Sequence, residues 1–157
     1  MSIVNEMCLD FYACPENEAF ARLTISAFIL PLNPTLEEMG DVKTAVSEAV
    51  TNAIVHGYAM KGGTVRMHAT LNSENMLTVD VIDNGCGMAD VEKAREPFFT
   101  TAPDSERSGM GFTIMESFMD AIRVTSAPGR GSLACLEKIV MPRSRSSAPV
   151  SKKASRW

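Results

Sequence analysis

The chain of 157 residues lacks the features that mark membrane and secreted proteins. No hydrophobic run approaches the roughly 20 residues that a membrane-spanning helix needs, because charged residues interrupt every stretch. The first residues carry neither the basic region nor the apolar segment of a secretory signal. The four cysteines are scattered, without the close pairs of a metal site. These absences predict a cytoplasmic protein with free thiols and no membrane partner.

Positive charge is scarce in most of the chain and concentrated at its C-terminal end. Residues 143–157 contain five basic residues and no acidic residue, which leaves 10 basic and 19 acidic residues in residues 1–142, a net charge of −9. Such a body repels nucleic acid and suits a basic protein partner. We predict a folded domain over residues 1–142 and a disordered basic tail over residues 143–157. A solubilising appendage is the favoured explanation of the tail, with contact to nucleic acid or a membrane as the alternative.

Hydrophobic periodicity predicts an α+β domain. Alternating patterns predict strands at residues 6–13, 64–72, 76–83, 121–127 and 132–140. Helical spacing predicts helices at residues 18–30, 35–56 and 112–119, the second opening with a capping box of Thr35 and Glu38. The short link after residue 72 predicts an antiparallel hairpin. The order of elements predicts a two-layer sandwich with helices on one face of a mixed or antiparallel sheet.

The same patterns predict which faces are apolar. The first helix is predicted to bury the apolar residues Phe20, Leu23, Ala27 and Phe28. The second helix has a continuous apolar stripe made of Val42, Ala45, Val46, Ala49, Val50, Ala53 and Ile54. The first strand has one apolar face, compatible with an exposed edge that pairs with a second chain, made of Met7, Leu9 and Phe11.

The second helix carries the first candidate motif. Glu48, Asn52 and His56 follow one another at intervals of four residues and so share one helix face. A carboxylate one turn from an amide oxygen suits a hard cation with a hydroxyl group beside it. Taken alone, the same spacing is more typical of an ordinary polar helix face that ends at Gly57.

Two glycine motifs lie further along the chain. Asp83 ends a predicted strand and is followed by Gly85 and Gly87, which let the backbone approach a flat ligand, while the carboxylate can accept a hydrogen bond from the exocyclic amine of adenine. The alternative is a glycine turn with a local aspartate cap. Gly109 and Gly111 open a predicted helix, whose free amides favour phosphate. Neither a Walker loop nor the dinucleotide fingerprint is present.

The order and spacing of these motifs resemble the GHKL ATPase superfamily. The chain has counterparts of the three nucleotide-binding motifs of this superfamily. They are Glu-x-x-x-Asn on a helix, Asp-x-Gly-x-Gly after a strand and Gly-x-Gly before a helix. Within it, residues 17–22, 46–58, 99–101 and 106–116 closely resemble the anti-sigma-F kinases of spore-forming bacteria, with similarity over about residues 5–142. We do not expect a histidine kinase, because neither His56 nor His68 lies in an upstream phosphoacceptor helix pair.

The resemblance implies a Bergerat-type site for ATP or ADP with Mg²⁺. In it Glu48 is the general base for a substrate serine, Asn52 holds the Mg²⁺ and Asp83 recognises adenine. The other ATP-binding residues that it implies are Gly85, Gly87, Thr100, Thr101, Arg107, Ser108, Gly109, Met110, Gly111, Phe112 and Ser132. Ser132 stands where the family usually has threonine, and Cys86 between the site glycines predicts a thiol-sensitive pocket.

The resemblance also implies partners. They are a sigma factor of the sigma-F type, which the protein inhibits, an anti-anti-sigma factor, which it phosphorylates, and a second copy in a homodimer, with no direct contact to nucleic acid. Arg22 matches a family arginine that contacts both protein partners. ATP is expected to favour sigma binding or phosphorylation, and ADP a stable complex with unphosphorylated substrate. The alternatives are a stress-response kinase of the sigma-B type and a nucleotide-gated anti-sigma binder without phosphotransfer, for which Glu48 is dispensable.

Overall fold

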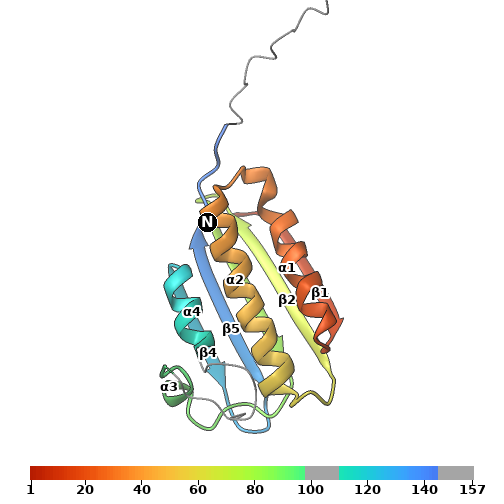
Figure 1. Ribbon diagram of the computed structural model, residues 1–157. Helices are drawn as coiled ribbons and strands as arrows, with labels where there is room; N and C mark the ends of the chain where they lie inside the picture. Colours follow the sequence, from red (N-terminus) through yellow and green to blue (C-terminus); the bar gives the residue numbers. More distant parts are fainter. Residues whose placement is uncertain (98–109, 145–157) are drawn as a thin grey trace, which may run out of the picture.

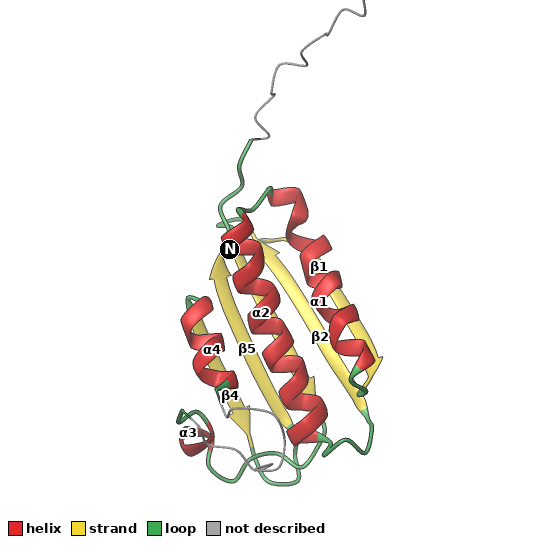
Figure 2. Cartoon of the chain, in the orientation of Figure 1, coloured by secondary structure: helices red, strands yellow, loops and turns green. Residues whose placement is uncertain are grey.

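Helices cover one face of a five-stranded antiparallel sheet in the computed structural model, which describes residues 1–97 and 110–144 (Figure 1). The strands lie in the order β1-β2-β3-β5-β4, and their bounds are β1 (Ile3–Tyr12), β2 (Thr64–Asn72), β3 (Met76–Asp83), β4 (Ala121–Ser126) and β5 (Ser132–Ile139). The helices α1 (Glu16–Ile29), α2 (Leu36–Asn52) and α4 (Gly111–Phe118) lie side by side over the sheet (Figure 2). This confirms the predicted two-layer α+β fold and the hairpin of β2 and β3.

Helix α2 lies over the centre of the sheet and ends at the site described below. Its capping box is present, because Thr35 Oγ1 accepts from the Glu38 amide at 3.0 Å and Glu38 Oε2 accepts from the Thr35 amide at 2.9 Å. The predicted apolar stripe is buried throughout. The α-helix, however, ends at Asn52 and continues as a π-helical turn, η2 (Ala53–Gly57), where the sequence predicted α-helix to residue 56. Such turns are frequent at functional sites.

The prediction for the buried face of α1 was wrong. The residues that α1 buries are Ala21, Ile25 and Ile29. Phe20 is 51% exposed and Leu23 is 64% exposed, and Ala27 also faces solvent, while Phe28 packs against the core. A helix with apolar residues on two sides leaves one set uncovered. The short turn η1 (Leu30–Leu32) follows it.

Strand β1 forms one edge of the sheet, as predicted. The predicted apolar face nevertheless offers no surface to a partner, since Phe11 is buried and Met7 and Leu9 pack against the core, whereas Ile3, Val4 and Tyr12 of the same strand are exposed. The opposite face of β1 carries polar side chains, with Glu6 paired to His68 and Asp10 paired to Arg66 of β2, both at 2.7 Å. The apolar alternation of β1 is therefore explained by the core.

The sequence predicted no membrane-spanning helix and no paired cysteines. Within residues 1–97 and 110–144, no helix combines the length and apolar character needed to cross a bilayer. The cysteines Cys8, Cys14, Cys86 and Cys135 are all free thiols, which confirms that prediction.

Candidate functional site

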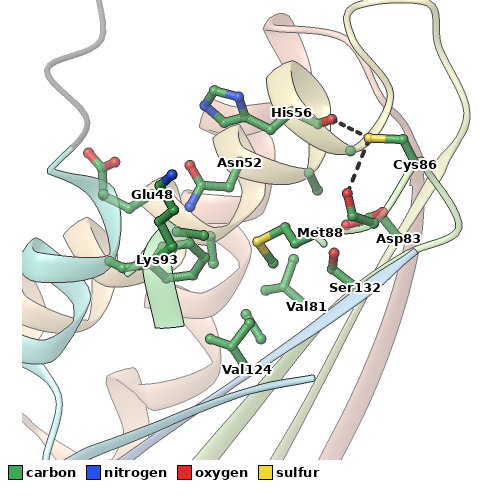
Figure 3. Close-up of a pocket in the computed structure, with 18 of the residues that line it drawn as sticks. Glu48, Asn52, His56, Val81, Asp83, Cys86, Met88, Lys93, Val124 and Ser132 are labelled. Atoms are coloured by element: carbon green, nitrogen blue, oxygen red, sulfur yellow. Dashed lines mark hydrogen bonds between the residues drawn. The ribbon is translucent and has the colours of Figure 1, made fainter. Parts of the chain in front are cut away.

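A cavity of about 760 Å³ opens where the end of α2 meets the sheet, α4 and the short helix α3 (Val91–Ala94) (Figure 3). This volume lies in the range of pockets that enclose small ligands, roughly 300–1,000 Å³. Its described lining is Glu48, Ala49, Asn52, Ala53, His56, Gly57, Val81, Asp83, Cys86, Gly87, Met88, Ala89, Asp90, Lys93, Ala94, Met110, Gly111, Phe112, Ile114, Val124, Ser132 and Ala134. Polar groups gather at two separate ends of it.

Glu48 and Asn52 form one end, against the start of α4. The helix face predicted from their spacing does line the cavity, together with His56 (Figure 3). Gly111 lies directly against them: a Cβ there would stand 3.1 Å from Glu48 Oε2 and 3.3 Å from Asn52 Oδ1. The absence of a side chain at Gly111 therefore keeps the carboxylate and the amide side by side and accessible.

Asp83 forms the other end and is 5% exposed, the one charged residue that is buried in the described part of the chain. Its Oδ1 accepts a hydrogen bond from the Gly85 amide at 2.9 Å. Burial raises the pKa of the Asp83 carboxyl, and the backbone amides of Gly85 and Ser132 offset part of that rise. A buried carboxylate of this kind is ready to accept a hydrogen bond from a ligand amine.

Apolar side chains separate these two ends. Val81 of β3 and Met88 lie between Asn52 and the side of Asp83 and Ser132, and Val124 of β4 lies further below (Figure 3). Ser132 and Ser126 join their hydroxyls at 2.9 Å at the edge of this surface. The middle of the pocket therefore suits a flat, weakly polar ring whose polar edge faces Asp83.

Close backbone contacts between β3 and η2 create the Asp83 end. The Cys86 amide donates to the Gly57 carbonyl at 2.8 Å, and a Cβ on Gly85 would stand 1.9 Å from that carbonyl oxygen. Gly87 has φ +69° and would bring a Cβ within 2.0 Å of the Ala127 carbonyl oxygen. These glycines are required because the chain passes too close to other backbone for a side chain.

Most of the predicted site residues that the structure describes line this one cavity. They are Glu48, Asn52, Asp83, Gly87, Met110, Gly111, Phe112 and Ser132. Gly85 acts from outside the lining through its contacts with Asp83 and Gly57. Arg22 lies outside the cavity, on α1. The predictions for Thr100, Thr101, Arg107, Ser108 and Gly109 lie outside the described residues.

Sequence reasoning assigned no role to several lining residues. Val81 could have been found, because it lies two residues before Asp83 on the inward side of a strand that alternates clearly. Met88, Asp90 and Lys93 lie in a segment with little periodicity, which gives no signal for the direction of a side chain.

The Glu48 end has the chemistry that Mg²⁺ prefers. Amide and carboxylate oxygens are hard donors, and Mg²⁺ is usually bound by one or two such protein groups together with substrate phosphates and waters. Asn52 Oδ1 and Glu48 Oε2 both lie next to the position of Gly111, and both residues are half-buried. Among residues 1–97 and 110–144, no group of three or more His, Cys, Asp or Glu side chains is arranged to hold a metal ion. The residues present therefore fit an ion that arrives with a phosphate ligand.

Comparison with known proteins agrees with this geometry. The profile of the histidine kinase-like ATPase domain matches residues 11–136. Among solved structures, the RsbU and RsbW domains of a Mycobacterium tuberculosis protein superpose with a TM-score of 0.65 at 18% identity, covering 90% of this chain and 34% of that one. The catalytic domain of the histidine kinase ThkA gives 0.53 at 17% identity, covering 87% of this chain and 97% of that one. The fold and the pocket thus define a histidine kinase-like ATPase domain, a class that binds nucleotides.

Sequence relatives show to which family within this class the chain belongs. An anti-sigma F factor of Clostridium acetobutylicum is 55% identical over 134 residues, covering 85% of this chain and 93% of that protein. Another from Halalkalibacterium halodurans is 52% identical over 135 residues, covering 85% of this chain and 92% of that protein. The chain therefore belongs to the anti-sigma F factors of the histidine kinase-like ATPase family.

Proposed function

We propose that this protein is an ATP-dependent serine kinase that phosphorylates an anti-anti-sigma factor and also binds and inhibits a sigma factor of the sigma-F type. The observation that carries the proposal is the division of one pocket into two polar ends, with Asp83 at one end and Glu48 beside Asn52 at the other. A pure binding site for adenine would need only the first end. Sporulation as the setting, and the anti-anti-sigma factor as the substrate, are proposed on the family relationship.

The two ends orient ATP in one direction. The buried carboxylate of Asp83 accepts a hydrogen bond from the 6-amino group of adenine, and Val81 and Val124 pack against the ring. The phosphates then extend toward Asn52, which would hold Mg²⁺ through its amide oxygen. The bound ion supplies charge neutralisation along the phosphates.

Glu48 then lies where the acceptor hydroxyl must arrive. In the proposed step the serine oxygen forms a bond to the γ-phosphorus, the bond between that phosphorus and the oxygen of ADP breaks, and Glu48 takes the serine proton. The half-buried position of Glu48 next to Gly111 suits this role, because a protein substrate has to enter from outside. Most of the catalytic effect comes from positioning.

We assign the protein partners to the exposed side of α1. Arg22 has a side chain that is 41% exposed and lies 3.7 Å from Glu18, and the apolar residues Phe20 and Leu23 are exposed nearby on the same helix. Arginine is enriched in interface hot spots, and the exposed Phe20 and Leu23 add apolar area on the same helix. Glu18 also accepts a hydrogen bond from Ser47 of α2, next to Glu48, so this surface is joined to the helix that carries the base.

Two further assignments follow the family relationship. We propose a homodimer that uses the sheet face opposite the helices, where Ile139 of β5 is exposed and is separated by β3 from the polar pairs of β1 and β2. We also propose that residues 1–142 are the functional domain and residues 143–157 a basic appendage, with the whole protein acting in the cytoplasm.

A reconstitution experiment tests the proposal. The full chain, the candidate anti-anti-sigma factor, the sigma factor and ATP·Mg²⁺ are mixed, and the serine phosphate is sought by mass spectrometry while the sigma complex is followed by size-exclusion chromatography. The proposal predicts a phosphoserine on the anti-anti-sigma factor and a sigma complex that forms with ATP. A protein that binds ATP and the sigma factor but produces no phosphoserine would be a nucleotide-gated binder instead.

A further inference from the structure

Lys93 occupies the side of the cavity that faces Glu48 and Asn52. It belongs to the short helix α3, and its backbone amide donates to Asp90 Oδ1 at 3.0 Å. Its side chain lines the cavity and runs from α3 toward Glu48 and Asn52 (Figure 3). The ammonium group is therefore presented to the end of the pocket that lies away from Asp83.

The backbone that carries Lys93 is fixed to the neighbouring helix. Arg95 follows two residues later, and its Nε donates to Glu116 Oε1 of α4 at 2.9 Å. A second nitrogen of the same guanidinium also contacts Glu116, so the pair has two points of attachment. Because Arg95 is committed to this pair, it secures α3 against α4 while Lys93 is directed into the cavity.

Most charged side chains that line the cavity in the described residues are negative, and Lys93 is positive. The described lining contains the carboxylates Glu48, Asp83 and Asp90, and in that lining Lys93 is the one lysine or arginine side chain. A nucleoside polyphosphate brings several further negative charges, and close to carboxylates these are stable only when cations pair with them. An ammonium group is a compact charge with rotatable donors and is a common phosphate ligand.

We propose that Lys93 is a phosphate-binding residue, whose ammonium donates hydrogen bonds to the polyphosphate of the bound nucleotide from the α3 side of the pocket. This assignment rests on the proposed function, because it requires adenine at Asp83 and phosphates toward Asn52. Lys93 thus adds a positive charge on the side of the cavity that faces Glu48 and Asn52 of α2. The expected ligand is a nucleoside di- or triphosphate, and adenosine without phosphates gains nothing from Lys93.

Calorimetric titration of the full chain with ATP·Mg²⁺, ADP·Mg²⁺ and adenosine tests the assignment. Lys93→Gln should bind ATP about tenfold more weakly than the wild type, as expected for a lost charge-assisted hydrogen bond that is partly exposed, and should bind adenosine equally well. Lys93→Arg should retain most of the ATP affinity. Lys61→Gln makes the same charge change at an exposed turn outside the cavity and should leave all three affinities unchanged.

The two proposals fail in different ways. Equal ATP affinities of the wild type and Lys93→Gln would overturn the role of Lys93 alone. An equal loss of affinity for adenosine and for ATP would also overturn it, since that result indicates a structural change of the pocket. A wild-type protein that does not bind ATP would overturn the proposed function together with this inference.

Discussion

Gly57 at the end of η2 touches Asp83 at the end of β3: a Cβ on Gly57 would stand 2.8 Å from Asp83 Oδ1. These residues are far apart in sequence and belong to different layers of the fold. The contact places the Asp83 carboxylate, the proposed acceptor for adenine, directly against η2, which continues the helix that carries Glu48 and Asn52. The two polar ends of the pocket are therefore joined through a single helix.

Substitution of Gly57 by alanine tests this contact. The added methyl group forces the Asp83 carboxylate to shift, so we expect Gly57→Ala to weaken ATP binding about tenfold, as a lost hydrogen bond to a charged group would. Gly40→Ala is the matched control, because Gly40 lies in α2 with open space around its Cβ position. That variant should bind ATP normally and gain about 0.5–1 kcal/mol in unfolding free energy. Equal ATP affinity for both variants would contradict the assigned contact.

The variant Asp83→Asn tests the role of this carboxyl group both in ATP binding and in the pH dependence of protein stability. The variant should bind ATP at least about tenfold more weakly, since the amide replaces the charged acceptor. Burial raises the pKa of Asp83, so the folded protein holds the carboxyl proton more tightly than the unfolded chain. Stability from this group is thus complete below the ordinary aspartate pKa and is lost as pH rises through the raised value.

Urea unfolding of the wild type and Asp83→Asn from about pH 4 to about pH 7 measures this effect. We expect the wild type to lose stability relative to the variant as pH rises. A difference that changed in the opposite direction would show that the folded protein stabilises the ionised carboxylate.

Thiol alkylation distinguishes the cysteines by environment. Burial, helped by Asp80, raises the pKa of the Cys135 thiol to about 11, so Cys135 should resist iodoacetamide at about pH 8. Cys86 is exposed and lines the cavity, and Cys8 is exposed on β1. Peptide mass spectrometry should show both Cys8 and Cys86 modified, with ATP slowing only Cys86. Equal labelling of Cys86 with and without saturating ATP would contradict the placement of the nucleotide.

The exposed side of α1 should act in binding and contribute little to folding. Leu23→Ala and Arg22→Ala should weaken the sigma complex at least about tenfold, as interface hot spots do. Since Leu23 is 64% exposed and Arg22 makes only a surface pair, their thermal unfolding should change little. The buried control Ile25→Ala should instead lose about 2–5 kcal/mol of stability. Normal sigma binding by both surface variants would exclude this side of α1 as the interface.

The sequence predicted those parts of the fold in which one periodic pattern dominates. The bounds of β2 and β3 and the buried stripe of α2 were correct, because each has a single apolar face. Helix α1 was assigned the wrong face, since Phe20 and Leu23 compete in the pattern with Ile25 and other residues that the fold covers.

The candidate site was predictable to a similar degree. The face of Glu48 and Asn52 follows from helical spacing, and the glycines mark close backbone approach. The inward direction of Lys93 could not be predicted, because its segment has little periodicity and the contact of Arg95 with Glu116 beside it is long-range.

The most direct test of the account is single-turnover phosphoryl transfer from ATP·Mg²⁺ to the anti-anti-sigma factor, comparing the wild type with Glu48→Gln at saturating nucleotide. Glu37→Gln, at an exposed position in the first turn of the same helix, is the control. If Glu48 is the base, Glu48→Gln should bind ATP with nearly unchanged affinity and transfer phosphate at least about 100-fold more slowly, while the control keeps the wild-type rate. Transfer by Glu48→Gln at the wild-type rate would contradict the role assigned to this carboxylate.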